Sequence, residues 1–215
     1  MTAAKPGFST DCRQCGRLAR HLAQVRAEFP DYHAKPVAPF GAARPRLLIV
    51  GLAPGMHGAN RTGRPFTGDY AGVLLYETLH RFGFASQSVA VSRDDGLRLE
   101  ACRITNAVKC LPPENKPTTD EVKCCNAYLR QEIDVLPQGA AILALGGVAH
   151  RAVLMARGLR PGACRFAHGA RHDLPDGRRL YDSYHCSRYN TQTKRLTTEM
   201  FRQVFEAMSS DLNTR

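Results

Sequence analysis

Four short runs rich in apolar residues are spaced along the chain, at 46–51, 103–109, 140–146 and 179–184. The first and third are almost continuously apolar, whereas a strand with one face in solvent alternates apolar and polar residues. Continuous runs of this length are typical of parallel strands that are covered on both faces. We therefore predict one strand for each run.

Helical patterns separate these runs. The clearest begins behind Pro117, where Thr118 and Glu121 have the spacing of a capping box. Its apolar positions recur at helical spacing and would form one buried face. These positions are Val122, Cys125, Leu129, Ile133 and Leu136. Further helices are expected from the cysteine pair at 12 and 15 to about residue 29, over 71–82, after 146 to about 156, and around 201–208.

Strands that alternate with helices predict a three-layer α/β/α sandwich with a central, mainly parallel four-stranded sheet. With 215 residues, 43% of them hydrophobic, the chain has the size of a single domain over 1–215, with the polar residues 1–11 expected to be flexible. In such sheets ligands bind beyond the carboxyl ends of the strands. The loop after residue 51, the region of Asn106 and the loop at His185 are the places to look for a site.

The net charge of the chain indicates which class of partner it suits. Lys and Arg outnumber Asp and Glu by 30 to 19, a formal net charge of +11, which suits a polyanion such as nucleic acid. A basic surface also occurs on proteins that merely stay soluble. The sequence has neither a secretory leader pattern nor an apolar run of about 20 residues, so we expect a cytoplasmic protein with no membrane partner. A monomer is the simplest expectation for its oligomeric state.

Eight cysteines without a secretory signal favour metal ligands or buried thiols over disulfides, because cytosolic thiols stay reduced. Cys12 and Cys15 share one turn, Cys110 follows a predicted strand, and Cys124 and Cys125 lie on the next helix. Cys125 shares the apolar face of that helix, whereas Cys124 is turned away from it. Four thiolates suit either zinc or an iron-sulfur cluster.

Burial as small apolar side chains is the alternative for any of these thiols. It is our preferred interpretation for four of the eight, namely Cys102, Cys124, Cys164 and Cys186.

Residues 51–69 contain five glycines directly after a predicted strand, so the backbone there can approach a ligand closely. The segment lacks the Gly-Lys-Ser/Thr ending of a phosphate-binding loop and the three-glycine dinucleotide pattern. This segment resembles the first motif of the family-five, or type b, uracil-DNA glycosylases. Residues 104–113 resemble the central strand and cluster segment of that family, and 185–197 resemble its last motif. The three follow in the family's order and cover most of the chain from Cys12 onward.

The resemblance implies an α/β/α enzyme that starts base excision repair. Such an enzyme flips a nucleotide out of DNA and hydrolyses the N-glycosidic bond of uracil, and of other deaminated bases such as hypoxanthine and xanthine. It also implies a structural 4Fe-4S cluster, with zinc as the less favoured occupant. The cysteines that match the family's cluster ligands are Cys12, Cys15, Cys110 and Cys125. DNA that contains such bases would be the partner, in the nucleoid of the cytoplasm.

The same resemblance suggests roles in the pocket. Phe66 would stack on the flipped base, Asn106 would read its polar edge, and His185 would donate a hydrogen bond to the leaving base. Gly55 and Ala53 would contact the base. Relatives often carry an acidic or amide side chain where Ala53 stands, so another group must orient the attacking water.

Asn60 and Asp69 are the two candidates for the residue that orients the attacking water. We prefer Asn60, because it lies in the middle of the loop, whereas Asp69 has the position of a cap for the next helix.

The last motif would contact the DNA. Arg188 and Tyr189 would fill the space left by the flipped nucleotide and bind phosphate, together with Ser187 and Asn190. Cys186 departs from the apolar residue usual there, which affects the expected packing beside His185.

Two alternatives remain at this stage. A non-catalytic module, in which a metal supports a basic nucleic-acid-binding face, accounts for the charge and the cysteines but not for the glycine-rich loop or His185. A sister glycosylase type with the same cluster and a narrower substrate range is the second alternative, and Ala53 argues against it because that type carries an acidic residue there.

Overall fold

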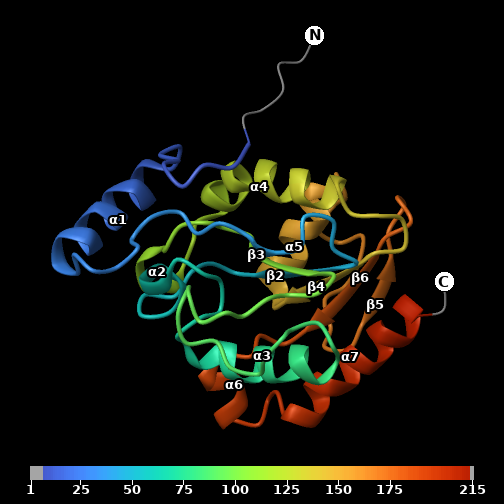
Figure 1. Ribbon diagram of the computed structural model, residues 1–215. Coiled ribbons are helices and arrows are strands. Elements are labelled where there is room, and N and C mark those ends of the chain that lie inside the picture. The colour runs from blue at the N-terminus through green and yellow to red at the C-terminus, as the bar shows by residue number, and fades with distance from the viewer. Residues whose placement is uncertain (1–6, 214–215) are drawn as a thin grey trace.

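The central sheet has six strands, in the order β1-β3-β2-β4-β6-β5, in a computed structural model that describes residues 7–213 (Figure 1). The four inner strands are parallel, as predicted from the apolar runs. They are β2 Leu47–Gly51, β3 Cys102–Asn106, β4 Ala141–Leu145 and β6 Arg179–Ser183.

The prediction of four strands missed the two edges. β1 Phe40–Gly41 pairs antiparallel with β3, and β5 Arg171–Asp173 pairs antiparallel with β6. β1 is two residues long in a Pro-rich approach, and β5 is a charged triplet. Segments this short carry no apolar alternation, so the sequence pattern could not reveal them.

Helices cover both faces of the sheet, so the predicted three-layer fold is confirmed (Figure 1). α1 Gly16–Glu28, α4 Thr119–Asp134 and α5 Gly147–Ala156 contribute to the apolar cluster on one side. α3 Tyr70–Arg81 and α7 Thr198–Asn213 cover the other. Three short elements lie in the loops, namely α2 Ala59–Thr62, the 3-10 turn η1 Pro113–Asn115 and α6 Arg188–Gln192.

The sheet is apolar on both faces because successive side chains point in opposite directions. In β2, Leu48 and Val50 pack in the cluster with α4 and α5, whereas Leu47 and Ile49 pack with α3 and α7. All four side chains have no exposed surface. The continuous apolar run of the sequence is thus explained by burial in two separate cores.

α4 begins where the capping box predicts. The Thr118 hydroxyl accepts the Glu121 N–H at 3.3 Å, and the Glu121 carboxylate accepts the Thr118 N–H at 2.8 Å. These bonds satisfy two N–H groups that have no partner inside the helix. Cys125 lies on the buried face of α4, as its helical phase predicts.

None of the described helices is long and apolar enough to span a bilayer. Residues 1–6 of the segment expected to be flexible lie outside the described residues. Phe8 packs edge-on against Tyr128, with ring centroids 5.6 Å apart.

Candidate active site

A pocket of about 290 Å³ opens at the carboxyl ends of β2, β3 and β6, where a parallel sheet binds its ligands. Residues from three strand-end loops line it together, which is the convergence that the sequence predicts. The lining residues are Leu52, Ala53, Gly55, Ala59, Phe66, Asp69, Ala71, Asn106, Asn115, His185 and Ser187.

Phe66 forms one wall of the pocket in a conformation that a bulky residue rarely adopts. Its φ is 54°, in the left-handed region, and its side chain is buried. Such a backbone costs on the order of 1–3 kcal/mol and persists only where its surroundings hold it. Tyr76 supplies part of that support, because its hydroxyl donates to the Pro65 carbonyl at 2.7 Å. The Phe66 ring stacks on His185, with centroids 5.8 Å apart.

Asn106 and Phe66 come together over Gly51, the last residue of β2. Gly51 and Asn106 are register partners in the parallel ladder. A methyl group at Gly51 would lie 2.4 Å from Asn106 Oδ1 and 2.7 Å from Phe66 Cζ, far inside contact distance. Glycine is therefore required at this position because two side chains occupy the space that a Cβ would fill.

The Asn106 amide is buried, and its Oδ1 atom has no hydrogen-bond partner among the described residues. Leaving a buried acceptor unsatisfied is unfavourable by about 1–3 kcal/mol. An unsatisfied acceptor at the wall of a pocket is an arrangement suited to a ligand that donates a hydrogen bond.

The main chain of His185 is held in place by the loop that follows it. The Asn190 amide donates to the His185 carbonyl at 2.8 Å, and Ser187 caps α6 by accepting the Asn190 N–H. Burial lowers the pKa of His185 from its ordinary value of 6.5 to about 4. The imidazole is therefore neutral at pH 7, with one N–H to donate and one nitrogen to accept.

Asp69 lines the pocket, whereas Asn60 is not among the lining residues. One Asp69 oxygen accepts the Gly72 N–H at 3.0 Å and caps α3, as its sequence position suggests. Burial raises the Asp69 pKa above its ordinary value, and the Gly72 and Ala71 N–H groups oppose part of that rise. Asn60 is fully buried within α2, so the geometry favours Asp69 where the sequence favours Asn60.

The segment expected to contact DNA divides into two parts. Ser187 lines the pocket and Asn190 supports His185, so both side chains serve the pocket itself. Arg188 and Tyr189 are exposed, and the Arg188 guanidinium lies 5.5 Å above the ring of Tyr70. Tyr70 is itself 44% exposed and directly follows Asp69. An aromatic and cationic surface thus adjoins the pocket.

Asn115 is a lining residue that the sequence analysis missed. It follows Glu114 in η1, and both have positive φ values, 57° for Asn115 and 53° for Glu114. Asn tolerates this conformation better than most residues. The Pro-Pro-Glu-Asn run is the only sequence signal, and it indicates a turn but not that the turn closes over a pocket.

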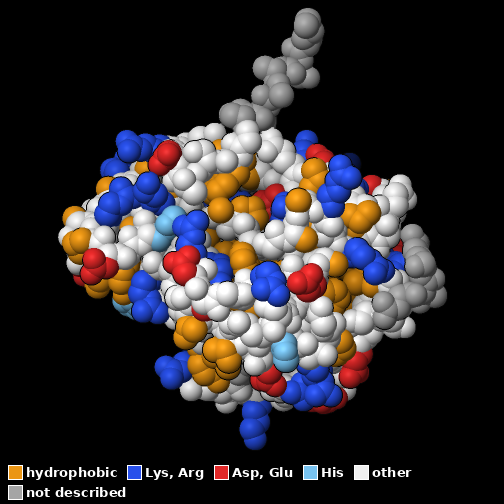
Figure 2. Space-filling model, viewed as in Figure 1, with side chains coloured by type: hydrophobic (Ala, Val, Ile, Leu, Met, Phe, Trp, Pro, Cys, Tyr) orange, Lys and Arg blue, Asp and Glu red, His pale blue; other side chains and the backbone are white. Residues whose placement is uncertain are grey.

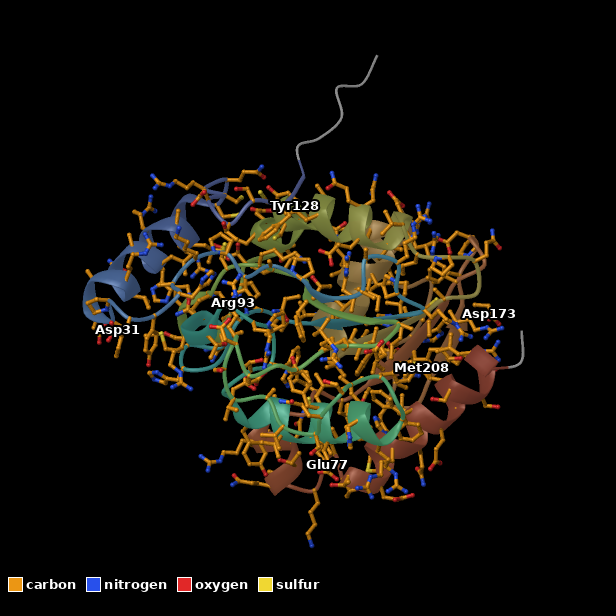
Figure 3. All side chains as sticks on the ribbon, viewed as in Figure 1. Asp31, Glu77, Arg93, Tyr128, Asp173 and Met208 are labelled. Atoms are coloured by element: carbon orange, nitrogen blue, oxygen red, sulfur yellow. The ribbon has the colours of Figure 1, made fainter. Side chains whose placement is uncertain are left out.

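A second site gathers the cysteines around one hollow near the start of α1. The four cysteines predicted as metal ligands, Cys12, Cys15, Cys110 and Cys125, all line it. The Cys125 sulfur accepts the Lys109 N–H at 3.3 Å, and Tyr128, labelled on α4 in Figure 3, donates its hydroxyl to Cys12 at 3.4 Å. Segments more than a hundred residues apart are thus brought to one place.

Cys124 also lines this hollow, although its helical phase predicts that it points away. It is half-buried, and its sulfur lies 3.4 Å from the Gln14 side-chain oxygen. Burial raises the pKa of Cys110, and the nearby thiols of Cys125, Cys12 and Cys15 raise it further. Cys110 therefore lies near the other three predicted ligands, which line the same hollow.

Comparison with known proteins assigns the family. Residues 38–209 match the model of the uracil DNA glycosylase superfamily. A type-5 uracil-DNA glycosylase of Thermus thermophilus is 48% identical over 91% of both chains. Proteins of the same name from Pyrobaculum aerophilum and Mycobacterium tuberculosis are 41% and 44% identical, over 94% and 90% of this chain and 89% and 75% of theirs. These matches confirm the resemblance of the sequence motifs, and the chain belongs to the type-5 group of the uracil DNA glycosylase superfamily.

Proposed function

We propose that the protein hydrolyses the N-glycosidic bond of uracil in DNA after the nucleotide has been flipped into the pocket. The observation that carries this proposal is that Phe66, Asn106 and His185 line one pocket at the ends of three strands. A base inside a duplex is out of reach of any side chain, so flipping is the step that brings it to these groups.

Recognition of the base rests on Phe66 and Asn106. The aromatic ring offers a flat apolar face, on which a planar base stacks. The unpartnered Asn106 Oδ1 accepts an N–H from the edge of uracil, and the amide N–H₂ group donates to a neighbouring carbonyl of the base. Binding thus satisfies an acceptor that the free protein leaves unsatisfied.

His185 stabilises the departing base. As the glycosidic bond breaks, positive charge develops on the sugar and negative charge on the base. A neutral imidazole donates its N–H to that negative charge without placing a competing cation beside the sugar. The low pKa of His185 keeps it in the neutral form across the physiological range.

Asp69 orients the water that attacks the sugar. Ala53 offers only a methyl group, which cannot orient water, and Asp69 is the acidic residue among those that line the pocket. Only one of its oxygens is required to cap α3 through Gly72. The other oxygen is available to accept a proton or a hydrogen bond from water.

The DNA backbone binds the basic surface around the pocket. Lys and Arg side chains are spread over the face shown in Figure 2, consistent with the net charge of +11. Arg188 and Tyr189 are the exposed residues closest in sequence to the pocket wall at Ser187. We assign them to phosphate binding and to the space that the flipped nucleotide leaves.

The pocket also suits larger deaminated bases. Ala53, Ala59 and Ala71 line it with small side chains, which leaves room beside a pyrimidine. Hypoxanthine and xanthine present an N–H and a carbonyl on adjacent ring positions, as uracil does, so Asn106 can read them in the same way.

Cys12, Cys15, Cys110 and Cys125 in the cysteine hollow would hold a 4Fe-4S cluster. The cluster would link the N-terminal segment to α4 and to the segment after β3, and it would take no part in bond cleavage. Sulfur spacing favours a cluster over zinc. Four thiolates around one zinc ion lie roughly 3.8 Å apart, given Zn–S bonds of about 2.3 Å. No three of the cysteine sulfurs in residues 7–213 lie within 4.8 Å of one another.

The test is single-turnover excision from a duplex that carries one uracil opposite guanine. We expect abasic sites from the wild-type protein, and a strong decrease for Phe66→Leu. Phe82→Leu is the matched control, because Phe82 packs against Phe205 on α7, away from the pocket. Binding of the duplex without formation of abasic sites would favour a non-catalytic module instead.

The variant Asp69→Asn tests separately whether Asp69 orients the attacking water. The amide oxygen of asparagine still accepts the Gly72 N–H, so the helix cap is preserved while the carboxylate is lost. Excision should fall about 10²-fold or more with little change in stability. A comparable loss for Asn60→Ala, with Asp69→Asn unaffected, would return the assignment to Asn60.

A further inference from the structure

Two histidines and an aspartate form a cluster outside the pocket and the cysteine hollow. His150 comes from α5, His172 from β5 and Asp182 from β6. His150 Nδ1 lies 2.8 Å from one Asp182 oxygen, and His172 Nε2 lies 3.2 Å from the other. All three ligand atoms lie within 4.8 Å of one another, the one such group of three in the part of the chain that the structure describes.

The burial of this cluster makes its charge important. Asp182 has no exposed surface, and the His150 side chain is 1% exposed. A buried carboxylate requires a cation or several hydrogen bonds to compensate for lost hydration. Here each carboxylate oxygen faces one imidazole nitrogen, so the compensating charge must lie on the two rings or on a cation between them and Asp182.

The second nitrogen of His150 fixes the orientation of its ring. His150 Nε2 lies 3.0 Å from the Cys164 carbonyl, and a carbonyl only accepts, so this nitrogen carries hydrogen. His150 Nδ1 is then directed at Asp182. Histidines that bind a metal through one nitrogen commonly donate the other N–H to a backbone carbonyl in this way.

We propose that His150 Nδ1, His172 Nε2 and one Asp182 oxygen form a binding site for a single Zn²⁺ ion. Nitrogen and oxygen ligands at about 2.0–2.1 Å from tetrahedral zinc are roughly 3.3 Å apart, so the observed spacing requires only small side-chain shifts. His172 is the most exposed of the three, at 17%, which gives the ion a route from solvent and leaves a water as fourth ligand.

The site would stabilise one edge of the sheet. It joins β5, which is only three residues long, to β6 and to the first turns of α5. β6 ends at Ser183, two residues before His185, so the ion would also hold the strand that leads into the pocket. The mixture of nitrogen and oxygen ligands distinguishes this site from the thiols at the start of α1.

Zinc binding to the cluster-loaded protein tests the proposal. After anaerobic dialysis against Zn²⁺, iron and zinc are measured together by elemental analysis. We expect one equivalent of zinc per wild-type chain with unchanged iron. His172→Ala should bind that equivalent ~10-fold or more weakly, whereas the control His80→Ala, which changes an exposed histidine on α3, should bind it as the wild type does.

His172→Gln is the second variant. The glutamine amide can still form a hydrogen bond to Asp182 but lacks the imidazole nitrogen that would bind zinc. Circular dichroism on this variant separates loss of zinc binding from loss of the fold. Zinc K-edge absorption on the wild type should show nitrogen and oxygen neighbours with imidazole scattering. Equal zinc content in the wild type and both His172 variants, or sulfur as a zinc neighbour, would overturn the proposal.

Discussion

The pocket and the cysteine hollow both include residues at or just after the carboxyl end of β3, yet the two sites are built in opposite ways. Asn106 ends β3 at the pocket, and Cys110 lies four residues further on, in the hollow. The pocket leaves Asn106 Oδ1 without a hydrogen-bond partner in residues 7–213 and holds Phe66 at a positive φ. In the hollow the sulfurs receive hydrogen bonds, as Cys125 does from Lys109.

This difference indicates that the two sites have different roles, one in binding a substrate and the other in stabilising the fold. Unsatisfied and strained groups are stable only until a ligand completes them, which suits a site that meets its substrate briefly. Sulfurs drawn from distant segments suit a permanent link. Replacing a side chain that faces the ligand in the pocket should therefore lower activity with little loss of stability, while replacing a thiol of the hollow should destabilise the fold itself.

The largest effect is expected for Cys125→Ala. Cys125 is a buried thiol that we propose as a cluster ligand, so its removal should abolish iron binding, with loss of the brown colour expected of a cluster and a large decrease in the thermal midpoint. Cys124→Ala, the neighbour that is half-buried beside Gln14, is the control and should keep most of its iron. Loss of iron from Cys124→Ala alone would exchange the two assignments.

His185→Ala should lower single-turnover excision by about 10²–10³-fold, the usual loss when one donor to a developing negative charge is removed. Fluorescence anisotropy should show nearly unchanged binding to the uracil duplex, and the iron content should be that of the wild type. Unchanged excision would refute the role of His185, and loss of iron would show that the two sites are not separable.

Gly51→Ala should disturb the pocket through packing. The added methyl group would overlap Asn106 Oδ1 and Phe66, so we expect a loss of about 1–3 kcal/mol in the free energy of unfolding, measured by chemical denaturation. Gly55→Ala is the control, because the nearest atom to its added methyl group is 3.8 Å away. Equal stability of the two variants would contradict the close approach at Gly51.

The final prediction concerns the pH dependence of stability. Burial lowers the pKa of His185 in the folded protein from 6.5 to about 4, so between these values the unfolded chain binds more protons than the folded one. The contribution of His185 to stability is therefore complete above pH 6.5 and is lost as the pH falls toward 4. His185→Gln should remove this part of the pH dependence, and an unchanged profile would mean that the imidazole is not desolvated.

The inner sheet and the caps were predictable because their signals are local. β2 and β4 are continuous apolar runs, and the capping box of α4 is readable from Thr118 and Glu121 alone. Gly51 belongs to a visible glycine-rich segment, although the reason for it lies in two side chains from other parts of the chain.

Features that depend on distant segments were not predictable in this way. The choice between Asn60 and Asp69 depends on which side of α2 faces the pocket, and a loop sequence does not specify that. Asn115 lines the pocket from η1, where it and Glu114 have positive φ values that the sequence does not reveal. His150 and Asp182 are 32 residues apart and meet only after β6 has paired with β4.

The two outer strands have a consequence for contacts between molecules. A sheet with a long, flat and unpaired edge offers its free N–H and C=O groups to any neighbouring chain, and soluble proteins avoid this with short or charged margins. β1 is two residues long, and β5 carries Arg171 and Asp173 on a span of three. Both edge strands are therefore too short to pair with a strand of another molecule and form an intermolecular sheet.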